Sequence, residues 1–80
     1  MTIEQLRRTH AARPFRPFTI HVADGRSFKI SHPEFLAITG AGRTVIVGSE
    51  RDDSFEVVDL LLVTTLQVHE NGRGSGRRAA

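Results

Sequence analysis

The stretch from Phe18 to His32, FTIHVADGRSFKISH, constrains the fold more than any other, because it predicts a β-hairpin whose register can be worked out. Apolar and polar residues alternate in both arms, and a strand with this period of two has one apolar face. Residues opposite each other in an antiparallel pair lie on the same face, so the register must match apolar with apolar positions. The pattern therefore predicts two paired strands, over 18–23 and 27–31.

The length of the turn follows from that requirement. A two-residue Asp24-Gly25 turn would place Ile20 opposite a lysine and mix the two faces. A three-residue loop, Ala23 to Gly25, places Ile20 opposite Phe28 and leaves one face apolar and the other polar. The longer loop also puts Gly25 at the left-handed position that follows a type I turn. We therefore predict a three-residue loop that ends at Gly25.

Outside the hairpin, capping, proline and β-branched patterns place the remaining elements. Thr2 and Gln5 have the spacing of a capping box and begin a predicted helix over 2–12. Pro14 and Pro17 then keep the chain extended up to the first strand. Further strands are predicted over 43–48, 55–58 and 64–69, which brings the total to five.

Two segments leave alternatives open. Ser31-His32-Pro33-Glu34 has capping-box spacing for one helical turn, and residues 35–38 then either continue the second strand around a bend or form a short new strand. Residues 59–63, DLLLV, are compatible with a buried strand or with a one-turn helix. We favour the helical turn, capped by Asp59, because leucine replaces the β-branched residues there.

The length and composition bound the class of protein. Eighty residues make one domain, predicted over 1–70. A domain this small buries only about 60% of its unfolded surface, so oligomerisation would supplement its stability. The absence of cysteine excludes disulfides and thiolate metal sites and suits a reducing cytoplasm. No signal peptide and no apolar run of membrane-spanning length occur, so we expect a cytoplasmic protein without a membrane partner.

The charge is unevenly distributed along the chain. The segment 71–80, predicted to be a disordered tail, contains three of the 11 basic residues and no acid, which leaves eight basic against nine acidic residues elsewhere. Residues 1–43 carry seven basic and three acidic side chains, whereas residues 44–70 carry one basic and six acidic side chains. This asymmetry favours either one positive and one negative face or charges that intermix in space and serve solubility.

The order of elements resembles the Sm-like fold, a small SH3-like barrel that includes bacterial ring-forming RNA chaperones. The helix leading into FTIHVADGRSFKI and the closing VVDLLLVTTLQV carry the resemblance. It implies a mainly β fold, either a five-stranded antiparallel barrel or a strongly bent sheet with a short N-terminal helix, and pairing of the fourth and fifth strands between subunits. The chain also resembles short uncharacterised bacterial proteins with RPFTIHVADGRSF followed by HPEF, which implies no activity.

The residues that bind RNA in that family do not carry over to this chain. Where the family has a lysine-histidine pair on the fourth strand, Phe55 to Asp59 contains acids, which would repel phosphate. Ile30 to Phe35 likewise replaces the expected glycine and aspartate. The candidate nucleic-acid contacts are therefore only the dispersed basic residues Arg7, Arg8, Arg13, Arg16, Lys29, Arg73, Arg77 and Arg78.

Known catalytic and metal-binding patterns are absent from the sequence. The four histidines form no H-x-H or H-x-x-x-H pair, and the serines lack a nucleophile elbow. The glycines form no phosphate-binding fingerprint. We therefore predict no catalytic residue, no metal and no cofactor.

Two functions from different classes remain. The favoured one is a non-catalytic interaction or scaffold module that forms homo-oligomers through exposed strand edges and binds a protein partner. The alternative is a small barrel that binds single-stranded RNA through the basic residues named above, which the departures from the family motif make less favoured.

Overall fold

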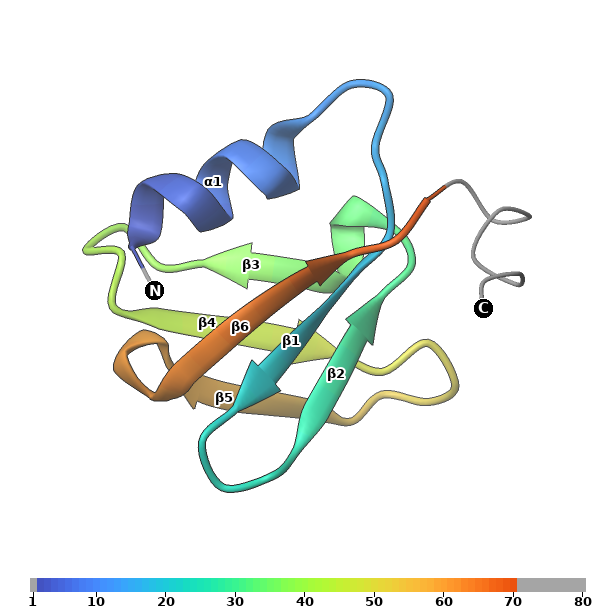
Figure 1. Ribbon diagram of the computed structural model, residues 1–80. Helices are drawn as coiled ribbons and strands as arrows, with labels where there is room; N and C mark the ends of the chain where they lie inside the picture. Colours follow the sequence, from blue (N-terminus) through green and yellow to red (C-terminus); the bar gives the residue numbers. More distant parts are fainter. Residues whose placement is uncertain (1, 71–80) are drawn as a thin grey trace.

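The computed structural model describes residues 2–70, which form one short helix and six strands (Figure 1). The elements are α1 (Ile3–Ala11), β1 (Phe18–Val22), β2 (Ser27–Ile30), η1 (Pro33–Phe35), β3 (Leu36–Ile38), β4 (Thr44–Gly48), β5 (Phe55–Asp59), η2 (Leu60–Leu62) and β6 (Val63–Val68). The fold is mainly β, as predicted. The predicted tail, with Arg73, Arg77 and Arg78, lies outside the described residues.

The predicted capping box sets the start of α1. The Thr2 hydroxyl accepts a hydrogen bond from the Gln5 amide, and the Gln5 side chain accepts one from the Thr2 amide. Leu6 is 1% exposed and packs into the core. His10 Nε2 lies 2.8 Å from the carbonyl oxygen of Pro33, so the last turn of α1 is fixed against η1.

The hairpin has the predicted register. Ile20 lies opposite Phe28, and the Val22 amide donates to the Arg26 carbonyl at 2.9 Å across a three-residue loop. Gly25 has φ +97°, the left-handed conformation that the loop requires. The register and the turn inferred from the alternation are thus confirmed.

The strands form two antiparallel three-stranded sheets. The first has the order β2-β1-β6 and the second β3-β4-β5. Alternate residues from both sheets face a shared core, and α1 lies above β3 and β6 (Figure 1). The buried core residues are Leu6, Phe18, Ile20, Val22, Ile30, Leu36, Val45, Val47, Val58, Leu60 and Val63.

The predictions of five strands and of a closed barrel are wrong for the described residues. The single turn η1 separates β2 from β3, so residues 36–38 form the short new strand, one of the two alternatives left open, and β2 and β3 belong to different sheets. The two sheets are therefore not closed into a barrel. The proposed capping box at the start of η1 is also absent, because His32 takes the N-cap position and its side chain makes no capping bond.

The corner before the last strand is the helical turn that we favoured. Asp59 ends β5, and its carboxylate accepts a hydrogen bond from the Leu61 amide at 2.9 Å. Leu60 packs into the core, whereas Leu61 is 79% exposed. The turn redirects the chain from the second sheet to the first, where β6 pairs with β1.

Candidate interaction surfaces

The described basic residues proposed for nucleic-acid binding are distributed over α1, the segment before β1, and β2. Arg7 and Arg8 are neighbours on α1, but the Arg7 guanidinium lies beside Gly42 in the β3–β4 turn, while Arg8 faces β6. Arg13 and Arg16 are exposed on the segment before β1, and Lys29 is exposed on β2. The structure thus gives Arg7, Arg8 and Lys29 different neighbours.

The free edge of β5 carries exposed apolar side chains. Within the described sheet β5 pairs only with β4, so its other edge has no strand partner. Phe55 and Val57 are 63% and 59% exposed, and Leu61 follows in the adjoining turn. The same strand carries the carboxylates of Glu56 and Asp59. This edge combines unpaired backbone groups, apolar surface and negative charge.

The free edge of β6 lies beside the helix. Thr64, Leu66 and Val68 form one side of a groove of about 470 Å³, and residues of α1 form the other. Arg8 contributes positive charge to the helical side. We call this the α1–β6 groove. It presents a strand edge next to a basic wall.

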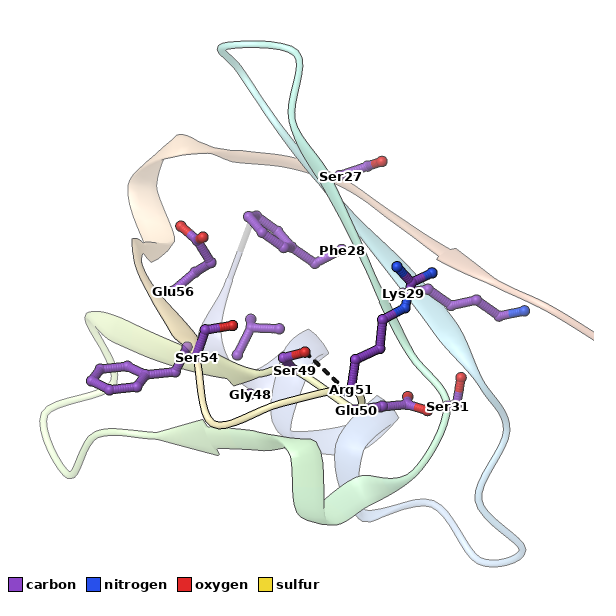
Figure 2. A pocket seen from close by; sticks show the side chains of 12 residues that line it. Ser27, Phe28, Lys29, Ser31, Gly48, Ser49, Glu50, Arg51, Ser54 and Glu56 are labelled. Atoms are coloured by element: carbon purple, nitrogen blue, oxygen red, sulfur yellow. Dashed lines mark hydrogen bonds between the residues drawn. The ribbon is translucent and has the colours of Figure 1, made fainter.

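A larger groove of about 590 Å³ lies beside the free edge of β2 (Figure 2). We call it the β2 groove. Arg26 connects its two sides at one end, because its guanidinium binds Glu56 of β5 at 3.3 Å while also binding Asp24 of its own loop at 2.8 Å. The groove is lined by Ser27, Phe28, Lys29, Ser31, Val47, Gly48, Ser49, Glu50, Arg51, Ser54, Phe55 and Glu56.

Two histidines stabilise the outer face of the first sheet. His69 Nε2 lies 2.8 Å from the Thr19 hydroxyl, and His21 Nε2 lies 3.0 Å from the Gln67 side-chain oxygen. These contacts join β1 to β6 and its C-terminal continuation, so both rings have structural partners. Within residues 2–70, no three histidine or carboxylate side chains are grouped closely enough to hold a metal ion.

Hydrogen bonds stabilise the ionised form of one carboxylate in the β4–β5 loop and one in the β1–β2 loop. The Ser54 hydroxyl donates to the Asp52 carboxylate at 2.6 Å, and this bond, with a second from the Ser54 amide, lowers the pKa of Asp52. In the β1–β2 loop, the backbone amide of Arg26 is the main cause of the lowered pKa of Asp24. Both carboxylates therefore stay ionised in the neutral range.

Comparison with protein-family models, curated proteins and solved structures finds no match to this chain. The Sm-like resemblance therefore stays a prediction. Among the described helices, none has the length and apolar character needed to cross a membrane.

The sequence did not identify the two edge surfaces or the β2 groove. The alternation in β5 placed Phe55 and Val57 on one face, but it contained no information on whether that face meets the core or the solvent. The groove on β6 requires α1 to lie beside a strand more than fifty residues away in sequence, a contact that no local pattern encodes.

Proposed function

We propose that the protein is a self-associating interaction module, in which the β5 edge of one copy pairs with the β6 edge of the next. The observation that carries this proposal is the apolar, unpartnered β5 edge, with Phe55 and Val57 both more than half exposed. An exposed edge with apolar side chains is a template for pairing with another chain. Withdrawing these two side chains from water would contribute roughly 1–2 kcal/mol each.

Charge favours a head-to-tail contact over a contact between two identical edges. Pairing β5 with β5 would bring two acidic strands together, in which Arg26 compensates Glu56 but Asp59 forms no salt bridge within residues 2–70, and directly opposed like charges destabilise a strand pair. The α1–β6 groove instead offers Arg8 beside an unpaired strand. A contact between two different surfaces repeats from copy to copy and generates either a ring or a filament.

The test is the mass of the protein by light scattering coupled to size-exclusion chromatography, over a range of concentrations. We expect a multiple of the 8.9 kDa chain mass. Val57→Lys places a charge on the apolar edge and should give the monomer mass. Ala37→Lys introduces the same charge at an exposed site on β3, at the other edge of the second sheet, and should leave the assembly intact. A monomer at every concentration, or an unchanged mass for Val57→Lys, would refute the proposal.

A further inference from the structure

The backbone of β2 presents unpaired hydrogen-bonding groups to the β2 groove. The bond from the Val22 amide to the Arg26 carbonyl fixes which residues of β2 face β1. In an antiparallel pair this role alternates, so Phe28 is bonded to β1, and the amides and carbonyls of Ser27 and Lys29 point the other way. Both residues line the groove. The groove therefore has a strand edge as one wall.

The inside of the groove suits an apolar side chain. Phe28 is half-buried and projects into the space between β2 and the start of β5 (Figure 2), and Val47 also lines the groove. The guanidinium of Arg26 lies 5.6 Å from the centre of the Phe28 ring, which fixes the ring at that end. A volume of about 590 Å³ lies within the range of sites that hold small molecules and short peptide segments.

The two ends of the groove differ in charge. At the Arg26 end, the guanidinium is already bound to Asp24 and Glu56. At the other end Lys29 and Arg51 line the groove, and neither forms a salt bridge within residues 2–70. Arg51 extends from the β4–β5 loop toward β2, and Glu50 is the only carboxylate lining this end (Figure 2). The residues that line this end therefore carry one more positive than negative charge, with the Arg51 guanidinium toward β2 and the Lys29 side chain on the outer face of that strand (Figure 2).

We propose that the β2 groove binds an extended peptide segment of a partner protein, which adds to β2 as a fourth strand of the first sheet. Its backbone pairs with Ser27 and Lys29, an apolar side chain contacts Phe28, and a carboxylate lies beside the guanidinium of Arg51. Strand addition derives affinity from main-chain bonds and specificity from alternate side chains. The site goes beyond the proposed self-association, because its pairing strand is β2, whereas that contact uses the strand edges of β5 and β6; Phe55 and Glu56 line the groove from the β5 side.

The experiment uses the full chain, labelled with ¹⁵N, and the capped peptide Thr-Val-Thr-Val-Glu-Glu as probe. We expect saturable amide shifts over residues 27–31 and 47–51. The matched peptide ending in Lys-Lys should bind about tenfold more weakly, because it loses the charge-assisted contacts. A peptide with proline in place of the central threonine loses a main-chain donor and should not bind.

Protein variants test the charge assignment. Arg51→Glu should lower the affinity for the acidic peptide at least tenfold and raise the affinity for the Lys-Lys peptide. Arg16→Glu makes the same charge change outside the groove and should leave both affinities unchanged. Thermal unfolding of both variants verifies that they fold.

Several results would overturn the inference: equal binding of the acidic and basic peptides, shifts confined to β5 or β6, or stronger shifts of the same amides with a single-stranded oligothymidine. Light scattering keeps the two proposals separate. The Arg51→Glu variant should bind the acidic peptide weakly and keep the assembly mass of the wild type. The Val57→Lys variant should have the monomer mass and bind the peptide with unchanged affinity.

Discussion

Replacing Gly25 by alanine isolates the contribution of one backbone conformation to the stability of the hairpin. Gly25 has φ +97°, and an added Cβ would have no atom within 4 Å, so the substitution introduces conformational strain without a clash. A left-handed conformation costs an L-residue about 1–2 kcal/mol. For a domain of this size, each kcal/mol lowers the melting temperature by about 4–8 °C.

Gly40 provides a matched control. An alanine there also meets no atom within 4 Å, and the backbone of Gly40 does not have a positive φ. Gly40→Ala should therefore be neutral or stabilise by up to about 1 kcal/mol, because alanine reduces the entropy of the unfolded chain. Gly25→Asn should retain more stability than Gly25→Ala, since asparagine tolerates the left-handed region.

The assay is urea and thermal unfolding followed by circular dichroism, at one protein concentration because self-association would raise apparent stability. We expect the Gly25→Ala and Gly40→Ala variants to differ by at least about 1 kcal/mol. Equal stabilities would refute the reasoning, since both sites have the same empty surroundings and differ in φ. That result would mean that the hairpin does not need the left-handed residue at its third loop position.

Three further substitutions test the helix, the corner and the loop. Leu6→Ala should lower the free energy of unfolding, measured with urea, by about 2–5 kcal/mol. The total expected for a domain of this length is about 4–12 kcal/mol. Glu4→Ala on the exposed face of the helix is the control. Asp59→Ala should cost about 1 kcal/mol in the same assay by removing the cap of η2, and Asp59→Asn should recover most of it. The pKa of Asp24 is lowered in the folded state from 3.8, so its stabilising effect is present above that value and is lost as the pH falls through the folded pKa. Asp24→Asn should therefore reduce the loss of stability below about pH 4 in an acid titration. An unchanged pH dependence of stability in that range would contradict the stabilising role of the ionised Asp24 carboxylate.

The hairpin was predictable because its determinants are local. Alternation fixed the faces of both arms, matching the faces fixed the register, and the register fixed the length of the loop. The capping box at Thr2 and the cap at Asp59 are local signals of the same kind, in which a side chain satisfies an amide two or three residues ahead. The structure contains each of these predicted features together with the hydrogen bonds that define it.

The assignment of strands to sheets was not predictable in the same way. The sequence allowed residues 35–38 either to continue the second strand or to begin a new one, and both alternatives place the same apolar residues inward. The choice depends on η1, whose first residue, Pro33, contacts His10 of the helix through its carbonyl. That contact spans 23 positions in the sequence. The strand count of five was wrong for this reason.

The interruption by η1 also explains why the described part of so small a domain has several free strand edges. A closed barrel removes its edges, whereas two separate three-stranded sheets have four. The edge of β6 is flanked by α1, the edge of β2 is flanked by the β4–β5 loop, and β3 is only three residues long. The edge of β5 has no comparable cover and carries Phe55 and Val57. An unprotected apolar edge on a monomer promotes uncontrolled aggregation. The proposed pairing of β5 with a second copy would cover the edge that the loss of closure leaves without a strand partner within residues 2–70.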